Sequence, residues 1–301
     1  MPADPIPLLI HLHIPRNAGS TLGRVLRLKL GFWPPSHLLH HFRTLGFYRL
    51  AGFQQRLDAI EALSVGDRRR VRLFEAHAGF GVHERLPQPW AYLTMLREPI
   101  DRAVSVFYYQ RQHDRIPDDM TLEQFVLHAD PQRVWWVDNA QVRYLAGTGG
   151  TIVDVARGQC TQTMLDVAIE RLEEAFAFVG IVEQFDESLV LLRRTFNWRG
   201  CYYVASNVTK RRRRTAELQS TELALLDEHN ELDRELYRHA KLLLERRVAD
   251  AGTSFVRELA QFRLRNKRHA RWIGPTQSIL SAGRPSIMKL VLGRTGLRKG
   301  Q

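Results

Sequence analysis

Short apolar runs along the chain have the length and composition of buried β-strands. Four of them are Pro7–Ile14, Arg72–Ala76, Ala91–Leu96 and Phe176–Val182, and Tyr202–Ala205 is a fifth candidate. Stretches in which apolar residues recur with helical spacing separate these runs. Strands that alternate with helices predict an α/β fold, in which a mainly parallel sheet is flanked by helices.

Three stretches carry the helical pattern clearly. After Ser20 the apolar residues recur every three or four positions as far as Leu30. Pro99 occupies the place of a proline that begins a helix, and Ile100–Tyr109 continues from it with helical spacing. Thr221–Val248 predicts one long amphipathic helix in the C-terminal part of the chain.

The end of the chain has a different composition. After residue 262 the apolar spacing is lost, and Gly, Pro, Ser and Arg become frequent. We therefore predict one domain over residues 1–262 and a basic tail over residues 263–301. Two interpretations of this tail remain open: it is disordered, or it is a peripheral anchor on anionic lipid, since it mixes cations with Trp272 and aliphatic residues.

Composition and charge narrow the class of protein. The 301 residues are 44% hydrophobic and 25% charged, which excludes disordered, collagen-like and disulfide-stapled chains. The net charge is +12, but ten Lys and Arg with no acid lie after residue 262, and 34 basic and 32 acidic residues make up the rest. The body is therefore nearly neutral and nucleic acid is not its expected partner, while a nucleic-acid-binding tail stays open as an alternative.

Cysteines and apolar runs indicate the compartment. Cys160 and Cys201 predict buried free thiols rather than a disulfide. No apolar run reaches the roughly 20 residues of a bilayer span, and no basic segment precedes the short apolar stretch at the N-terminus. We expect a cytoplasmic protein, with peripheral contact to the inner face of a membrane if the tail binds lipid.

The loop between the first strand and the following helix predicts an anion site. Backbone N–H groups at a helix start and the helix dipole both favour negative charge. Arg16 can add a full charge, and Ser20 and Thr21 can add hydroxyl donors. The Walker A pattern is absent from this stretch, which disfavours a nucleotide triphosphatase of that kind. A capped helix that follows a strand is the alternative.

A second candidate anion site lies at the end of the third predicted strand. Arg97 occupies this position, and the carboxyl ends of parallel strands face the crevice in which α/β proteins bind ligands. The planar guanidinium suits a pair of phosphate oxygens. Ser105 follows eight residues later, about two helical turns along. The alternative is an ion pair of Arg97 with Glu98 or Asp101.

Together the two motifs resemble those of the sulfotransferases that use 3′-phosphoadenosine-5′-phosphosulfate (PAPS), in the branch of the carbohydrate 2-O-sulfotransferases and their bacterial relatives. The loop of that family, His-Ile-Pro-Lys-Thr-Ala-Gly-Thr-Thr, corresponds to His13–Thr21 here. Its Leu-Arg-Glu/Asp-Pro motif corresponds to Leu96–Pro99, followed by Ser105. Weaker similarity continues at Asp138–Leu145, Gly180–Phe185 and Asp233–Tyr237.

The resemblance implies a P-loop-like three-layer fold with a long C-terminal helix. It implies in-line transfer of a sulfuryl group from PAPS to a hydroxyl of a glycan, a glycolipid or another small-molecule acceptor. The product nucleotide would be 3′-phosphoadenosine-5′-phosphate, and no metal would be required. The donor-binding residues that it implies are Arg16, Asn17, Ala18, Gly19, Ser20, Thr21, Arg97, Ser105, Lys210 and Arg211.

The resemblance also implies a general base and an acceptor site. His77 ends the second predicted strand and corresponds to the segment that supplies the base in related carbohydrate enzymes, with Glu75 and His83 as fallback bases. A structural histidine is the alternative for His77. Arg111 and Arg115 lie where such enzymes carry acceptor-binding arginines.

Arg16 stands where the family usually has a lysine. The resemblance implies that this residue contacts the leaving phosphate and the transferring sulfuryl group, which makes Arg16 a catalytic candidate. Arginine keeps the charge but is planar and bulkier than lysine. A catalytically weak or inactive relative that still binds nucleotide is therefore the alternative function.

Overall fold

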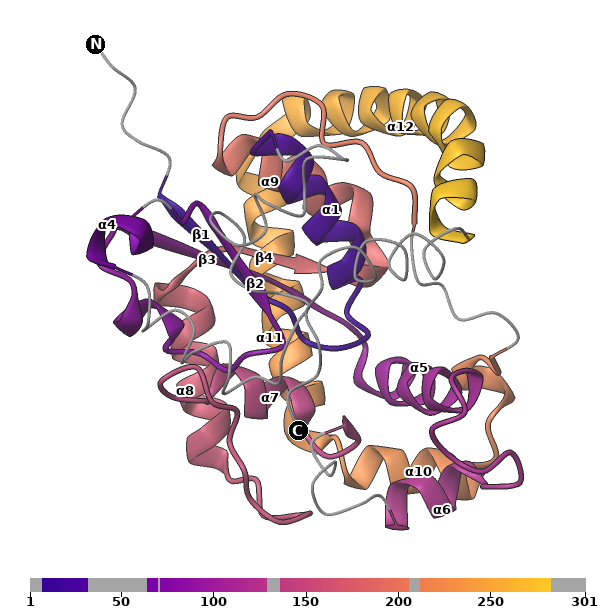
Figure 1. Cartoon of the computed structure of the whole chain (residues 1–301). Coiled ribbons are helices and arrows are strands. Elements are labelled where there is room, and N and C mark those ends of the chain that lie inside the picture. Colours follow the sequence, from indigo (N-terminus) through magenta and orange to yellow (C-terminus); the bar gives the residue numbers. More distant parts are fainter. Residues whose placement is uncertain (1–6, 32–63, 70, 129–135, 206–211, 283–301) are drawn as a thin grey trace, which may run out of the picture.

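The structure is a computed structural model of the chain. It describes residues 7–31, 64–69, 71–128, 136–205 and 212–282, with the side chains of the last helix described as far as residue 272 (Figure 1). Lys210 and Arg211 lie outside these ranges.

Within the described ranges, four strands form one parallel sheet. They are β1 (Leu8–Leu12), β2 (Leu73–Ala76), β3 (Trp90–Leu96) and β4 (Phe176–Ile181). The order across the sheet is β2-β1-β3-β4, and every neighbouring pair is parallel. The predicted parallel α/β sheet is thus confirmed. Because β1 and β3 are neighbours, the chain segments that follow them leave the sheet side by side.

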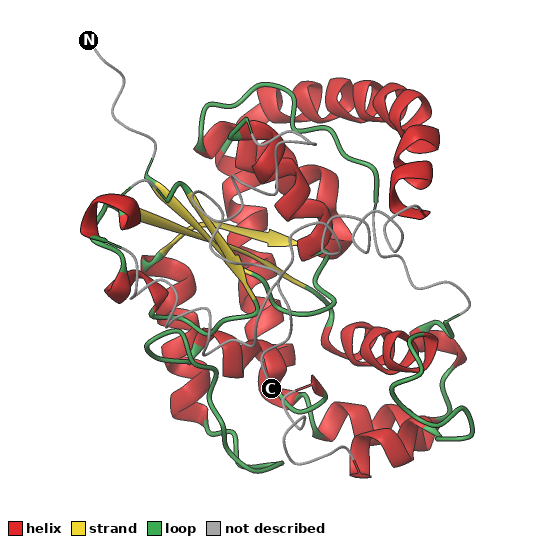
Figure 2. Cartoon of the chain, viewed as in Figure 1, coloured by secondary structure: helices red, strands yellow, loops and turns green. Residues whose placement is uncertain are grey.

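Helices cover the sheet on both sides (Figures 1 and 2). In the view of Figure 1, α1, α9 and α12 lie above the sheet and α7 and α8 lie below it, which gives the predicted three layers. The described helices are α1 (Gly19–Lys29), α4 (Val65–Arg68), η1 (Val82–Arg85), α5 (Pro99–Gln112), α6 (Leu122–His128), α7 (Ala140–Leu145), α8 (Gln162–Glu174), η3 (Val182–Gln184), α9 (Phe185–Thr195), η4 (Thr215–Glu217), α10 (Ser220–Glu228), α11 (Glu231–Asp250) and α12 (Gly252–Ala282).

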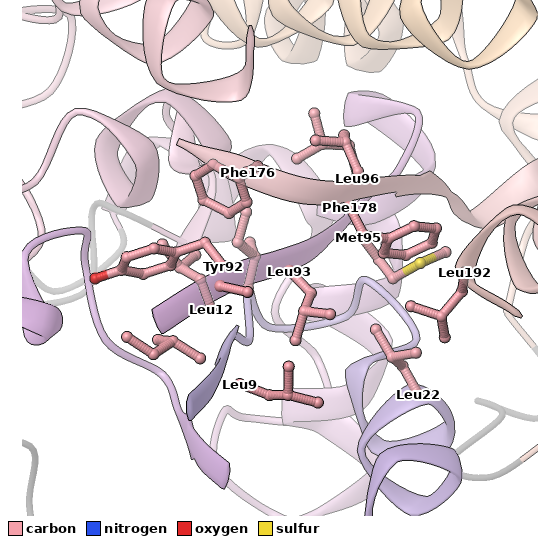
Figure 3. Close-up of a cluster of buried hydrophobic side chains, with 14 of the residues drawn as sticks. Leu9, Leu12, Leu22, Tyr92, Leu93, Met95, Leu96, Phe176, Phe178 and Leu192 are labelled. Atoms are coloured by element: carbon pink, nitrogen blue, oxygen red, sulfur yellow. The ribbon is translucent and has the colours of Figure 1, made fainter. Parts of the chain in front are cut away.

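The sheet forms the centre of the hydrophobic core. All five residues of β1 are buried, as are the last six of β3, because helices pack on both faces of these strands. Figure 3 shows Leu9, Leu93 and Phe178 of the sheet beside Leu22 of α1 and Leu192 of α9. This core fixes the directions in which β1 and β3 end.

A second hydrophobic cluster joins α5, α6 and α10. Phe107 of α5, Phe125 of α6 and Leu226 of α10 are among its buried members. Pro99 begins α5, as predicted, and the side chain of Glu98 accepts hydrogen bonds from the N–H groups of Ile100 (3.2 Å) and Asp101 (2.6 Å). The cluster holds α5, and with it Ser105, against the end of β3.

The prediction of one helix over Thr221–Val248 is wrong, because α10 and α11 are separate helices. Asn230 lies between them and is fully buried. Its side-chain amide donates to the carbonyl oxygens of Val137 and Leu226, both at 2.9 Å. A residue that competes in this way for backbone acceptors favours a break in the helix. The C-terminal part of the chain is still dominated by long helices, α11 and α12.

The predicted strand Tyr202–Ala205 is also wrong, since this segment joins no strand of the described sheet. Its backbone is held by a side chain instead: the N–H group of Tyr203 donates to Oδ1 of Asn266 in α12, at 2.8 Å. The apolar run is explained by packing of the tyrosines on helices rather than by a strand ladder.

The predicted boundary after residue 262 falls inside α12, so residues 263–282 continue a helix instead of starting a tail. Phe255 and Phe262 are buried, and Arg263 forms an ion pair with Glu187 of α9 at 2.6 Å. The spacing of the buried residues is hidden in the sequence because other large apolar residues of the helix, Val256, Leu264 and Trp272, are exposed. The first turns after residue 262 are therefore part of the domain.

Two further expectations concern the thiols and the membrane. Cys160 and Cys201 are free thiols, as predicted; Cys201 is buried, whereas Cys160 is only partly buried. Across the part of the chain that the structure describes, no helix combines the length and the apolarity that a membrane crossing needs.

A buried ion pair supports the segment before α7. Asp138 and Arg143 are both fully buried and form a salt bridge. Arg143 also donates to the carbonyl oxygens of Asp138 and Val155, both at 2.7 Å. Burial opposes ionisation of Asp138, but His229 and Arg143 more than offset it, and the pKa of this carboxyl lies below its usual value.

We predict that Asp138→Asn lowers the free energy of unfolding by about 3–5 kcal/mol, because it leaves the charge of Arg143 buried without a counter-charge. Chemical denaturation measures the change. Asp227→Asn is the matched control: Asp227 pairs with Arg234 at the surface, and we expect a change of about 0–1 kcal/mol. Similar values for the two variants would show that the buried pair is not a principal support.

Candidate functional site

A cavity of about 280 Å³ opens at the carboxyl ends of β1 and β3. Its wall comes from segments far apart in the sequence: the loop after β1, the end of β3, α5, the start of α9, and the chain between α9 and α10. The residues that line it are His13, Arg16, Ala18, Gly19, Ser20, Thr21, Arg97, Ser105, Val182, Phe185, Tyr203, Ala205 and Arg212.

The loop after β1 turns sharply into α1. Arg16 and Ala18 both have left-handed backbone conformations, with φ of 69° and 54°. Such conformations are unfavourable for residues other than glycine and are concentrated at binding sites. The residue before α1 is Ala18, whose methyl group cannot cap the helix. The start of this helix therefore presents backbone N–H groups and the positive end of its dipole to the cavity.

Asn17 anchors the loop instead of lining the cavity. Its side chain is buried, and Nδ2 donates to the carbonyl oxygen of Met95 in β3 and to Oε1 of Gln141, both at 2.8 Å. The structure therefore places the predicted donor-binding residues Arg16, Ala18–Thr21, Arg97 and Ser105 on one wall and turns the Asn17 side chain into the protein.

Gly19 makes room for a histidine ring at the start of α1. A Cβ atom at this position would lie 2.0 Å from Cδ2 of His13. The ring of His13 is buried and stacks on that of His11, with the ring centroids 5.2 Å apart. Burial, followed by the charge that His77 can carry, lowers the pKa of His13 well below its ordinary value. His13 is therefore neutral at physiological pH.

Arg16 is held at the cavity wall by two contacts from α5. Its Nε donates to Oγ of Ser105 at 3.0 Å, and its guanidinium lies over the ring of Tyr109, 4.6 Å from the ring centroid. Burial and the nearby charge of Arg97 lower the pKa of Arg16 to about 10. Arg16 therefore stays positive at neutral pH, and its charge is poorly solvated until an anion approaches.

Arg97 and Arg212 share one carboxylate. Nε of Arg97 donates to Oδ2 of Asp101 at 2.9 Å, and Nη2 of Arg212 donates to the same oxygen at 3.1 Å. Burial opposes ionisation of Asp101, but the two arginines more than offset it and lower its pKa. The predicted ion pair of Arg97 is thus present, and Arg97 nevertheless lines the cavity. Three arginines with one aspartate leave the cavity with excess positive charge.

The structure separates the three candidate bases. His77 is exposed, lies directly after β2, and its ring meets that of the cavity residue His13 edge-on with centroids 4.5 Å apart. Glu75 is buried and paired with Arg27. His83 contacts the ring of Trp90, at the amino end of β3, and so lies at the wrong end of the sheet. Glu75 also lies near His13, with its Oε1 3.9 Å from Nδ1 of that ring, so of the two candidates beside this cavity residue only His77 is exposed.

Arg111 and Arg115 take different positions. Arg111 donates to the carbonyl oxygen of Met120 and lies over Phe107, beside a second cavity of about 330 Å³. Arg115 is exposed and lies over the ring of Tyr109, 5.5 Å from its centroid. Because Arg16 contacts the same ring, Arg115 is the nearer of the two to the first cavity.

Sequence reasoning missed part of the wall. Phe185 and Tyr203 face each other edge-on, with ring centroids 4.7 Å apart, and Arg212 completes the cationic side. Arg212 belongs to a run of five cations, Lys210–Arg214. The resemblance implied donor binding by Lys210 and Arg211 of this run, which lie outside the described residues, and not by Arg212. No local pattern marked Phe185 and Tyr203 as neighbours.

Among the described residues, no three or more His, Cys, Asp or Glu side chains lie together in a way that could hold a metal ion. Within these ranges, the chemistry of the cavity is that of arginines, hydroxyls and backbone N–H groups.

We predict that Gly19→Ala lowers the free energy of unfolding by about 1–3 kcal/mol and displaces the loop, because the new methyl group would overlap the buried ring of His13. Chemical denaturation measures this loss. Gly66→Ala in α4 is the control, since its nearest atom, Oγ of Ser64, would lie 3.8 Å from the added Cβ. An unchanged stability of the Gly19 variant would mean that the loop and His13 are not tightly packed.

Several known proteins are similar to this chain. Galactose-3-O-sulfotransferase 3 of Bos taurus is 31% identical over 195 residues, which cover 61% of this chain and 44% of that protein. The Homo sapiens protein of the same name is 32% identical over 199 residues, or 60% and 45% of the two chains. The chain therefore spans about half the length of these curated relatives. A sulfotransferase from Alicyclobacillus acidocaldarius, known from a crystal structure, gives a TM-score of 0.39 with 14% identity, covering 81% of this chain and 96% of that chain.

The family match extends over nearly all of the described fold. The sequence model of the galactose-3-O-sulfotransferases matches residues 8–281, from β1 to the last turn of α12. This finding corrects the branch that the motifs suggested, the 2-O-sulfotransferases, and agrees with their wider assignment to sulfotransferases. The chain belongs to the galactose-3-O-sulfotransferase family.

Proposed function

We propose that this protein transfers a sulfuryl group from PAPS to a hydroxyl of a galactose-bearing glycan. The observation that carries the proposal is the cavity in which the loop after β1 and the end of β3 place Arg16, Arg97 and Arg212 together. Two separate anionic groups on one ligand suit this wall better than one, because its cations come from three segments: the loop after β1, the end of β3 and the chain before α10. Family membership adds the expectation of a sulfuryl donor.

The 5′ and 3′ ends of the donor nucleotide would contact different residues of the cavity wall. The backbone N–H groups at the start of α1, with Arg16, Ser20 and Thr21, suit the 5′-phosphosulfate. Arg97, Ser105 and Arg212 suit the 3′-phosphate, since guanidinium groups bind phosphate oxygens in pairs. The aromatic pair Phe185 and Tyr203 offers an apolar surface against which a purine can pack.

In-line transfer needs position and charge stabilisation. Arg16 is fixed by Ser105 and Tyr109, so its charge is already in place where the leaving phosphate gains negative charge. The acceptor oxygen attacks sulfur while the bond from sulfur to the phosphate oxygen breaks, and His77 accepts the proton of the acceptor hydroxyl. The neutral ring of His13, which touches both His77 and the loop, does not compete for this proton.

The acceptor is proposed as galactose, with its 3-hydroxyl as the site of transfer, because the matched family and the similar proteins carry this activity in their names. Arg115, exposed beside Tyr109, is the better placed of the two predicted acceptor-binding arginines, and Arg111 would act only from the second cavity. A glycolipid acceptor, a cytoplasmic location and membrane contact through the basic end of the chain stay predictions from the sequence.

A nucleotide-binding protein without turnover is the second candidate. It rests on the same contacts of Arg16: a guanidinium fixed by Ser105 and Tyr109 cannot follow a moving group as a lysine ammonium can. Nucleotide binding without measurable sulfate transfer would favour this candidate.

We predict that Arg97→Ala weakens the binding of 3′-phosphoadenosine-5′-phosphate about 10- to 100-fold, as expected for the loss of a charge-assisted hydrogen bond. Binding of adenosine 5′-phosphate, which has no 3′-phosphate, should change less than about 3-fold. Calorimetry measures both affinities, and Arg234→Ala, at the surface pair with Asp227, serves as the control. Equal losses for the two nucleotides would remove Arg97 from the 3′-phosphate site, and a wild type that binds neither would refute the proposed function.

We predict that His77→Ala keeps nucleotide binding and lowers turnover at least about 100-fold, because the acceptor hydroxyl loses its base. The measurement is transfer of labelled sulfate from PAPS to a β-galactoside, with the 3-deoxygalactoside as the acceptor that should receive none. His239→Ala is the matched control, since His239 pairs with Glu173 between α8 and α11. Near-normal turnover of the His77 variant would exclude His77 as the base, and equal transfer to the deoxy acceptor would exclude the 3-hydroxyl.

A further inference from the structure

A buried glutamine joins the two segments that carry the anion site. Gln141 lies in α7 and is fully buried. Its Oε1 accepts hydrogen bonds from Nδ2 of Asn17 at 2.8 Å and from the backbone N–H of Arg97 at 3.0 Å. Its Nε2 donates to the carbonyl oxygen of Arg97 at 3.0 Å. The Gln141 side chain therefore bonds to the loop after β1 and to both backbone groups of Arg97, the residue directly after β3.

The position of Gln141 is itself fixed from behind. The carboxylate of Asp233 in α11 accepts hydrogen bonds from the backbone N–H groups of Gln141 (3.0 Å) and Val142 (2.8 Å). In return, the N–H of Asp233 donates to Oδ1 of Asn139 at 3.0 Å. All four residues are buried. The glutamine thus sits on a rigid support that does not belong to the cavity wall.

Asn17 and Arg97 lie in different halves of the proposed donor site. Asn17 is in the loop that would hold the 5′ end of the nucleotide, and Arg97 would hold its 3′-phosphate. Neither the Asn17 side chain nor Gln141 lines the cavity. Hydrogen bonds in a dry interior hold their partners in narrow geometry. Two direct bonds also join the halves, from Arg97 to the carbonyl oxygen of Arg16 and from Asn17 to that of Met95, both at 2.8 Å. Gln141 adds the three bonds that reach the backbone of Arg97 and the side chain of Asn17 together.

We propose that Gln141 is a positioning residue that fixes the spacing of the two anion subsites and thereby selects nucleotides with phosphates at both the 5′ and the 3′ position. This inference rests on the proposed function, since it concerns the same donor site. It goes beyond that function because it assigns the preference for a bisphosphate to a side chain that touches neither phosphate.

The test compares three nucleotides: 3′-phosphoadenosine-5′-phosphate, adenosine 5′-phosphate and adenosine 3′-phosphate. Gln141→Met keeps the length of the side chain and removes its hydrogen bonds. We expect this variant to bind the bisphosphate about 10-fold or more weakly, and each monophosphate within about 3-fold of the wild type, because only the bisphosphate must satisfy both subsites at once. Calorimetry supplies the three affinities.

Gln88→Met is the matched control. The Gln88 side chain donates to the carbonyl oxygens of Arg68 (2.9 Å) and Val71 (3.0 Å), before β2 and far from the carboxyl ends of the strands. The Gln88→Met variant therefore loses partly buried side-chain hydrogen bonds away from the site. We expect its affinities for all three nucleotides to stay within about 3-fold of the wild type. Gln141→Glu keeps the shared acceptor but sets a buried carboxylate oxygen against the carbonyl oxygen of Arg97, so we expect its loss of bisphosphate affinity to be at least as large as that of Gln141→Met.

The outcomes separate this inference from the proposed function. A wild type that binds no bisphosphate refutes both. A wild type that binds it, with Gln141→Met unchanged or with all three nucleotides weakened equally, overturns the role of Gln141 and leaves the proposed function standing. Hydrogen exchange of the Arg97 amide gives a readout without any variant: we expect slow exchange before nucleotide is added, and rapid exchange there would overturn the inference as well.

Discussion

The mutual repulsion of guanidinium groups is the constraint that shapes this site. Arg16, Arg97 and Arg212 line one small cavity, and burial together with the charge of Arg97 depresses the pKa of Arg16. Such an arrangement persists only if other groups hold each cation in place. Asp101 accepts hydrogen bonds from Arg97 and Arg212. Arg16 donates to Ser105 and lies over the ring of Tyr109. One carboxylate for three cations reduces the repulsion and keeps the cavity attractive to anions.

The fold supplies the support that this arrangement needs. Because β1 and β3 are parallel neighbours in the core, their following segments meet at one edge of the sheet. The hydrophobic cluster of α5, α6 and α10 holds α5 in place, and Ser105 and Tyr109 of this helix contact Arg16. From the opposite side, α7 and α11 contribute Gln141 and Asp233, whose hydrogen bonds tie the two segments together. The wall is thus assembled from several elements, and none of them forms it alone.

The sequence predicted what depends on local order and missed what depends on distant partners. Apolar runs and Pro99 identified the strands and the start of α5, because burial and a fixed φ act within a few residues. The loop at Gly19 and the arginine at the end of β3 were predicted by the same local rules. Asn230 breaks a helix through a bond to Val137, 93 residues away, which no window along the chain contains. Similarly, Tyr203 reaches the cavity because Asn266 of α12 holds its backbone.

The arginine at position 16 can be understood from the same contacts. A lysine there would offer one point charge, which could bond to a hydroxyl or to an anion but has no planar surface to stack. Arg16 uses Nε for Ser105 and its face for Tyr109, and its terminal nitrogens lie on the far edge of the guanidinium. A charge fixed in this way requires little reorganisation when negative charge develops beside it. The exchange therefore turns a mobile cation into a preset one. For the reaction proposed above, a preset cation suits the leaving phosphate better than the sulfuryl group that moves.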